Sequence, residues 1–176
     1  IYFCKFLINI FCDNPMFKKI TDAITVLSGD VGVFHFPLIF EGDVGYVMGT
    51  RTDYLILLVE NEGNATIGGK IYLRAKGVIQ NPMVENVITG EKIKINKTLQ
   101  NGETVIINTI DGDDKGVWGI YQGVEQNYLA YWDFDNDWLK FSAGSTIIGY
   151  STENQSEDLL DVSIELNPEK FGLEEM

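Results

Sequence analysis

The chain has 176 residues, enough to bury one hydrophobic core with a smaller attached segment. Its hydrophobic fraction of 45% and aromatic fraction of 12% are typical of a globular protein and exclude a disordered chain. The 13 basic and 26 acidic residues give a net charge of −13, which repels nucleic-acid phosphates and anionic lipid headgroups. We therefore expect neither nucleic acid nor a membrane as a partner.

The first residues, Tyr2–Phe11, are nearly all apolar or aromatic, which is typical of a strand buried on both faces. Cys4 and Cys12 fall in this run, and about 26 Å of extended chain separates them. We therefore predict buried, reduced cysteines and assembly in a cytosol. The run lacks the basic region and the small-residue cleavage site of a signal peptide. Because the chain starts at Ile1 with a strand pattern already under way, we expect a further domain upstream.

Turn chemistry at Asp13-Asn14-Pro15 predicts the end of the first strand, and a short helix capped by Asn14 could follow it. Residues 31–40 then alternate as a strand, with the single histidine, His35, on one face. No polar companion for a general base or a metal ligand is readable near His35, so we interpret it as a surface residue. The glycine-rich residues 41–53 predict a domain boundary. We divide the chain into residues 1–45, the end of an upstream domain plus a connection, and residues 46–176, the main domain.

The main domain has regular strand patterns separated by turns. We predict strands at Tyr54–Asn61, Lys70–Lys76, Val84–Ile88, Lys92–Ile95, Thr104–Asn108, Val117–Tyr121, Asn127–Tyr131, Thr146–Tyr150 and Leu159–Leu166. No helical periodicity lies between them, and the short spacing requires antiparallel pairing because parallel strands need long crossovers. The sequence therefore predicts an all-β fold, an antiparallel β-sandwich.

No residue pattern predicts catalysis, a metal or a cofactor. His35 lies far in sequence from any serine or cysteine in a suitable turn, and phosphate-binding and dinucleotide-binding glycine motifs are missing. Two cysteines and one histidine cannot fill a structural zinc site. "DFDND" at 133–137 begins like a calcium loop, but Trp138 and Gly144 stand where an EF-hand needs glycine and glutamate. We expect a protein that is not an enzyme.

Aromatic residues are concentrated between positions 118 and 138. Proteins that bind sugars stack the sugar rings on exposed aromatic side chains, although the same residues more often pack between sheets. Both interpretations stay open for this stretch. Our candidates for contact with a sugar or a partner protein are Trp118, Tyr121, Trp132 and Trp138.

A series of short motifs resembles the phage distal tail protein (Dit, or siphovirus tail-component) family, over roughly residues 6 to 171. The motifs are the Asn61-Glu62-Gly63 step, Asn81-Pro82, the Thr89–Glu91 turn, the Leu99, Gly102 and Glu103 set, and Trp138-Leu139 leading to Gly144. Upstream, "INIFCDNPMF" is similar to the segment that joins the two domains of that family. Two turn positions depart from the family pattern: Asn64 replaces an aspartate, and Ser145-Thr146 lacks an asparagine.

The resemblance implies a galectin-like sandwich in the tail tip or baseplate of a phage or prophage virion, assembled in the cytoplasm of the bacterial host. It implies docking to other tail proteins, namely the tail tube, the tip and receptor-binding or side-fibre proteins. In the family an N-terminal domain forms a hexameric ring, and we expect the present chain alone to be monomeric. The alternative is a carbohydrate-binding module that recognises cell-wall polysaccharide of the host.

Overall fold

The computed structural model describes residues 16–18, 23–26, 28–32, 49–53 and 56–171. The predictions on Cys4, Cys12 and His35, and those on the strands at Tyr2–Phe11 and 31–40, lie outside the described residues.

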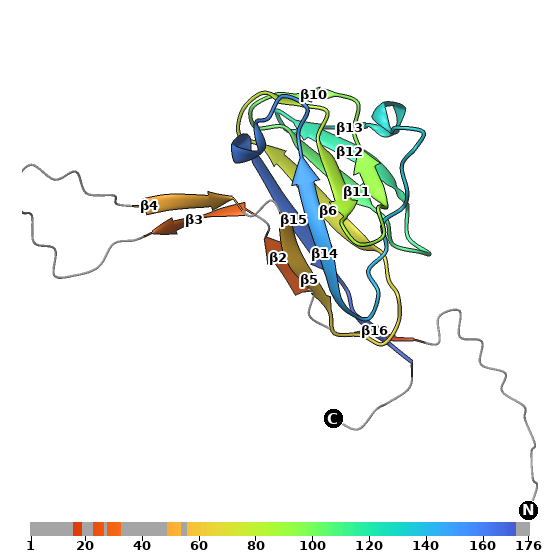
Figure 1. Ribbon diagram of the computed structural model, residues 1–176. Coiled ribbons are helices and arrows are strands. Elements are labelled where there is room, and N and C mark those ends of the chain that lie inside the picture. Colours follow the sequence, from red (N-terminus) through yellow and green to blue (C-terminus); the bar gives the residue numbers. More distant parts are fainter. Residues whose placement is uncertain (1–15, 19–22, 27, 33–48, 54–55, 172–176) are drawn as a thin grey trace, which may run out of the picture.

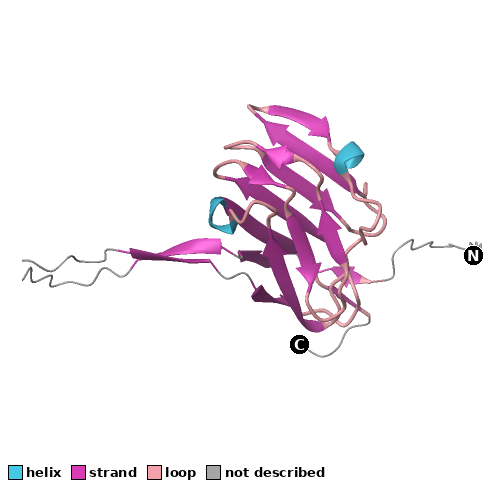
Figure 2. Ribbon diagram, turned by 45° about the horizontal axis from the view of Figure 1, so that its top comes forward, coloured by secondary structure: helices cyan, strands magenta, loops and turns pink. Residues whose placement is uncertain are grey.

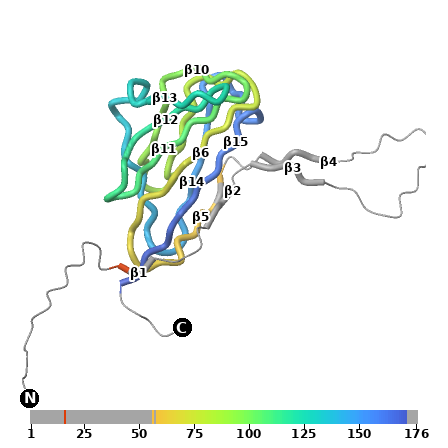
Figure 3. The backbone as a smooth tube through the Cα atoms, turned by 180° about the vertical axis from the view of Figure 1, so that it is seen from behind, coloured from red at the N-terminus to blue at the C-terminus, as the bar shows by residue number. Residues whose placement is uncertain are grey.

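The fold is an antiparallel β-sandwich, as the sequence predicted (Figure 1). The larger sheet has six strands, in the order β13 (Val124–Asn127), β12 (Gly116–Tyr121), β11 (Thr104–Asn108), β6 (Gly69–Ala75), β15 (Leu160–Leu166) and β2 (Ala23–Val26). The smaller sheet has four strands, in the order β5 (Ile56–Asn61), β14 (Gly144–Ser151), β8 (Met83–Asn86) and β9 (Lys92–Lys94). Seen from behind, β15 runs beside β6 (Figure 3), and its other side pairs with β2.

Three short antiparallel pairs complete the strands. They are β1 (Phe17–Lys18) with β16 (Glu169–Lys170), β7 (Ile79–Gln80) with β10 (Thr98–Leu99), and β3 (Ser28–Gly32) with β4 (Gly49–Asp53). The β3–β4 hairpin projects away from the sandwich (Figure 1). Two single turns of 3₁₀-helix, η1 (Leu129–Tyr131) and η2 (Glu157–Leu159), are the helical segments of the described chain (Figure 2). Within that part of the chain no helix is long and apolar enough to cross a membrane.

In β6, β11 and β15 buried residues alternate with half-buried or exposed ones, so one face of each strand packs in the core. In β15, Leu160, Val162, Ile164 and Leu166 are buried, while the residues between them are half-buried. The register places isoleucines opposite one another across the three strands. Ile71 of β6 pairs with Ile107 of β11 on one side and with Ile164 of β15 on the other. β-Branched side chains pack well on such a pleated surface.

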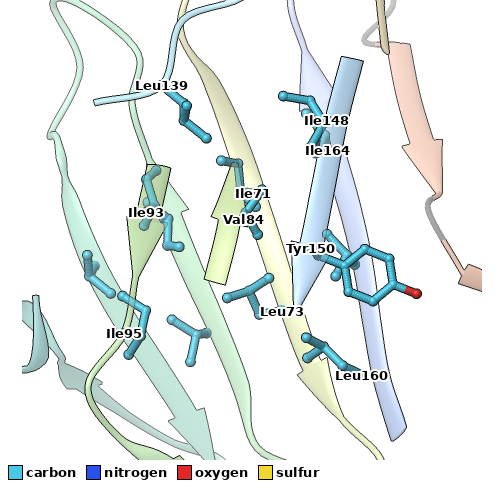
Figure 4. Packing of buried hydrophobic residues seen from close by; sticks show 14 of the residues in the cluster. Ile71, Leu73, Val84, Ile93, Ile95, Leu139, Ile148, Tyr150, Leu160 and Ile164 are labelled. Carbon is cyan, nitrogen blue, oxygen red and sulfur yellow. The ribbon is translucent and has the colours of Figure 1, made fainter. Parts of the chain in front are cut away.

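The core lies between the inner faces of the two sheets (Figure 4). Val84, Ile93 and Ile148 of the smaller sheet face Ile71 and Leu73 of the larger one, and all five are fully buried. Each such side chain contributes about 1.5–3 kcal/mol relative to an exposed one. The sandwich is therefore held by aliphatic packing, and its two outer faces are left for other contacts.

The predicted strand at Asn127–Tyr131 is wrong. Asn127 ends β13, and its Oδ1 accepts a hydrogen bond from the Leu129 N–H at 2.8 Å, which starts the η1 turn. Tyr128 turns inward and is buried, because Gly119 of β12 leaves room for its ring. The aromatic residues at 128 and 131 are thus packed in a turn, where their strand propensity has no effect.

The helix considered after Asn14 is also wrong in the described residues, since Phe17–Lys18 and Ala23–Val26 are strands. The β-branched residues Ile24, Thr25 and Val26 favour the extended conformation. β2 pairs with β15 and so belongs to the larger sheet, although it precedes the boundary expected at residue 46. The division into two domains stays a prediction.

Candidate interaction surfaces

The motifs that carry the family resemblance form turns and buried polar contacts in this structure. Asn61 is buried at the end of β5, and its Nδ2 donates to the carbonyl oxygens of Ala65 (2.8 Å) and Phe141 (3.0 Å). Its Oδ1 accepts from the N–H of Gly63 (3.0 Å). A Cβ at Gly63 would lie 2.4 Å from the Glu169 carbonyl oxygen, so glycine is required there. The Asn-x-Gly step thus joins three chain segments.

Glu103, at the end of the Leu-x-x-Gly-Glu motif, is the centre of a buried polar network. Its carboxylate is 1% exposed and accepts hydrogen bonds from Lys97 Nζ (2.8 Å), the Gln100 N–H (2.8 Å) and the Tyr128 hydroxyl (2.7 Å). Burial raises the pKa of Glu103, but these hydrogen bonds and the Lys97 charge outweigh it, so the pKa lies below its ordinary value of 4.5. Burial, followed by the bond to Glu103, raises the pKa of Tyr128 to about 12.

The two acidic clusters are loop structures. "DGDDKG" at 111–116 connects β11 to β12, and Asp111 pairs with Lys115 and with Lys140 (2.8 Å to Lys140). In "DFDND", Asp133 accepts from Asn96 Nδ2 at 2.8 Å and from the Asp135 N–H at 3.0 Å. Among the described residues, no group of three or more His, Cys, Asp and Glu side chains is arranged to hold a metal ion.

The four aromatic candidates lie in different places. Trp132 and Trp138 stack on each other with ring centroids 4.4 Å apart and an interplanar angle of 25°. Trp132 also packs against the core. Each therefore gives one ring face to the other, and both are half-buried. Tyr121, also half-buried, ends β12 on the side of the strand that carries the buried Val117.

Trp118 lies on the outer face of the larger sheet, opposite Ile106 of β11 and Asn127 of β13. Its six-membered ring lies over Gly116, where a Cβ would come within 2.8 Å of the indole, and the side chain is half-buried. The structure thus separates Trp118 from the stacked Trp132–Trp138 pair.

A polar groove of about 430 Å³ lies on this same outer face. Its side chains come from β6, β11 and β15, and they include Tyr72, Arg74, Thr104, Asp161 and Ser163. The register explains the grouping, because Arg74 pairs with Thr104 on one side and with Asp161 on the other. This groove was not among the sites predicted from the sequence. The alternation of β6 and β15 marked these side chains as outward-facing, but only the strand order brings them together.

The outer face of the smaller sheet carries an apolar patch, which we call the β5 patch and define as Ile56, Leu58, Val87 and Ile147. Ile56 and Leu58 are each 57% exposed, and Val87 is 43% exposed. Leu58 pairs directly with Ile147, and Val87 lies on the other side of Ile147, to whose carbonyl oxygen its N–H donates at 2.9 Å. Contiguous exposed apolar residues of this kind mark interaction sites.

The β5 patch lies at a sheet edge and is bordered by acidic groups. Among the described residues β5 is the outermost strand of the smaller sheet, so one side of its backbone is not used in the sheet ladder. Glu60, on the same face of β5, is exposed, and Glu85 lies across Gly149 from Ile56. The opposite edge, β9, is bonded to the segment that follows η1, since Asp137 N–H donates to the Lys92 carbonyl oxygen at 2.9 Å.

No family model and no curated protein matches this chain. The chain is similar to a chain in the structure of the phage P2 baseplate in its activated conformation with Ca, at 14% identity and a TM-score of 0.43, covering 82% of this chain and 52% of that one. It is also similar to a chain in the structure of the phage p2 baseplate in its activated conformation with Sr, at 13% identity and a TM-score of 0.40, covering 81% and 53%. The present chain thus spans about half the length of the solved chains it matches.

Proposed function

We propose that this chain is a structural component of a phage or prophage tail tip or baseplate, a distal tail protein whose sandwich docks a neighbouring tail protein, and that it has no catalytic role. The ordered motifs from Asn61 to Gly144 that resemble the distal tail family support the tail assignment. The observation that carries the docking role is the β5 patch.

The chemistry of the patch specifies its occupant. Ile56 and Leu58 alternate along an edge strand, so a partner segment that is apolar at alternate positions can pair with the β5 backbone and cover both side chains. Glu60 and Glu85 beside the patch, and the net charge of −13, favour a partner surface with lysine or arginine around the apolar contact. The same charge disfavours a second copy of this chain. We therefore assign the patch to a receptor-binding or side-fibre protein of the same tail.

The test is a binding measurement between this chain and the tail proteins encoded beside it, each co-expressed and purified. We expect one of them to bind, and we expect Leu58→Lys to weaken that binding at least tenfold, because it places a charge where about 1.4 kcal/mol or more of apolar contact is lost. The matched control is Val124→Lys on β13, an equally exposed valine (55%) at the edge of the other sheet. If no neighbouring tail protein binds, or if both variants bind like the wild type, the docking proposal is wrong.

A further inference from the structure

We propose that the outer face of the six-stranded sheet is a binding site for a neutral oligosaccharide, held by polar side chains in the groove and stacked on Trp118. This site lies on the opposite face of the sandwich from the β5 patch and does not depend on the docking role. It gives the chain a second activity, direct contact with a glycan.

The groove places both hydrogen-bond donors and hydrogen-bond acceptors within the reach of one small ligand. Thr104, Arg74 and Asp161 form one row across β11, β6 and β15, and Tyr72 and Ser163 are neighbours in the next row. Adjacent strands are about 4.8 Å apart, so each row spans about 10 Å. Arg74 supplies donors, Asp161 supplies acceptors, and the hydroxyls of Thr104 and Ser163 supply both. Vicinal sugar hydroxyls need this combination, since each donates one hydrogen bond and accepts others.

An apolar strip continues the groove toward the sheet edge. Ile106 lies between Tyr72 and Trp118 in one row, and Ile120 is opposite Thr104 in the other. Trp118 is thus two strands, or about 10 Å, from Tyr72. Its six-membered ring lies over Gly116, which gives the indole space against the strand. Sugar rings present C–H faces that pack on aromatic surfaces, and a disaccharide is long enough to reach from the groove to Trp118.

The charges of the site favour a neutral ligand. Asp161 forms an ion pair with Lys76 at 2.8 Å, and the Tyr72 hydroxyl donates to Glu165 at 2.7 Å. Arg74 and Asp161 are the charged side chains that line the groove, one cationic and one anionic, so the charge of its lining is balanced. An anionic polymer would meet the repulsion of the −13 chain, and a cationic one would find no uncompensated carboxylate pair in the groove. A neutral polysaccharide avoids both costs.

The stacked pair provides a matched comparison within the chain. Trp132 and Trp138 each have one ring face covered by the other and lie away from the groove, whereas Trp118 lies on the outer sheet face beside it. Trp118→Ala should therefore reduce glycan binding, and Trp138→Phe should leave it unchanged. Arg74 and Thr104 project from the outer face, so their replacement leaves the core intact.

The experiment is co-sedimentation of the chain with sacculi from several Gram-positive species, before and after chemical removal of the wall polysaccharide, together with titration on an array of neutral mono- to tetrasaccharides. We expect binding that is lost with the polysaccharide and competed by a neutral sugar. Trp118→Ala, Arg74→Ala and the groove-filling Thr104→Lys should each weaken it about tenfold or more. Thermal unfolding of each variant checks that it is folded.

Two results would overturn the site. One is a lack of binding to every sacculus preparation and every sugar on the array. The other is binding that the Trp118, Arg74 and Thr104 variants leave unchanged. Leu58→Lys, which tests the β5 patch, should retain full glycan binding, and Trp118→Ala should retain the tail-protein contact. The failure of one proposal can therefore be told from the failure of the other.

Discussion

At the scale of single residues, Asn61 shows how one buried amide stabilises a fold. It supplies two donors and one acceptor to backbone groups of Ala65, Phe141 and Gly63. Asn61→Ala leaves three backbone groups without these partners, so we expect a loss of about 2–3 kcal/mol in the free energy of unfolding, measured by urea denaturation. Asn64→Ala is the control, because the Asn64 side chain bonds to the exposed backbone of Phe171 and its loss should cost less than about 1 kcal/mol. Equal losses would contradict this assignment.

Glu103 makes stability depend on pH at the acid end. Its pKa is lowered in the folded state, so its contribution is fully present above the ordinary glutamate pKa of 4.5 and is lost as the pH falls through the lower folded-state pKa. Glu103→Gln removes this dependence. We expect the variant to be less stable than the wild type at pH 7, and the difference to shrink when urea denaturation is repeated at successively lower pH below 4.5. A difference that stays constant down to pH 3 would show that the carboxylate charge does not matter.

The same network also makes stability depend on pH at alkaline pH, where stability is lost as the pH rises. Tyr128 has its pKa raised to about 12, so the folded state retains a proton that the unfolded state loses. Its contribution is present below about pH 10 and is lost as the pH rises toward 12. Tyr128→Phe cannot titrate and keeps the ring over Gly119. It serves as the control, because its stability should fall less steeply between pH 10 and 12 than that of the wild type.

At the scale of elements, position within a sheet decides how firmly each strand is held. β6 is central, paired with β11 and β15, and its Ile71 and Leu73 are fully buried. Within the described part of the chain β13 pairs with β12 alone, and all of its residues are exposed. We expect amide hydrogen exchange to be slowest in β6, close to the rate set by global unfolding, and faster by several orders of magnitude in β13. Comparable protection of both strands would mean that β13 is covered by a contact the sheet does not explain.

The two edges of the smaller sheet differ in a way that bears on function. No described strand pairs with the outer edge of β5, which carries the exposed Ile56 and Leu58. Such an edge is an aggregation risk, which proteins usually reduce with charges, proline or a covering segment. β9, at the other edge, has such a segment, since the residues after η1 bond to its backbone. The contrast between the two edges of one sheet is the reason for assigning β5 to a partner.

At the scale of the whole molecule, alternation along single strands predicted most of the sandwich. Leu160–Leu166 and Thr104–Asn108 read directly as half-buried strands, because each residue's face depends only on its own position. Asn127–Tyr131 failed because a side-chain bond from Asn127 and the space over Gly119 override strand propensity. The bond from Asn127 lies within the segment, whereas the space for Tyr128 depends on Gly119, which is distant from the segment's own pattern.

The candidate sites were less predictable, for a related reason. Trp118 was a candidate from composition, but nothing local separates it from Trp132 and Trp138, whose stacking brings together residues six positions apart in an irregular segment. The groove joins Arg74, Thr104 and Asp161, which become neighbours only through the order of β11, β6 and β15. The sequence of a strand predicts which of its side chains share a face. The order of the strands in the sheet decides which faces join into one surface, and binding at a surface depends on that order.

Net charge is a property of the whole chain, and it should be visible in the salt dependence of unfolding. The net charge of −13 at pH 7 makes the compact state repel itself, and raising NaCl from 0.02 to 0.3 M shortens the screening length from about 20 Å to about 6 Å. If this relieves on the order of 1 kcal/mol, the melting temperature should rise by about 2–4 °C.

Near the isoelectric point of about 4.3 the net charge vanishes, and the same addition of NaCl should give no rise in melting temperature. KCl at equal ionic strength should act like NaCl, because screening does not depend on ion identity. A melting temperature that falls with salt at pH 7 would mean instead that attractive pairs, such as Lys97 with Glu103 and Lys76 with Asp161, outweigh the repulsion among the excess carboxylates.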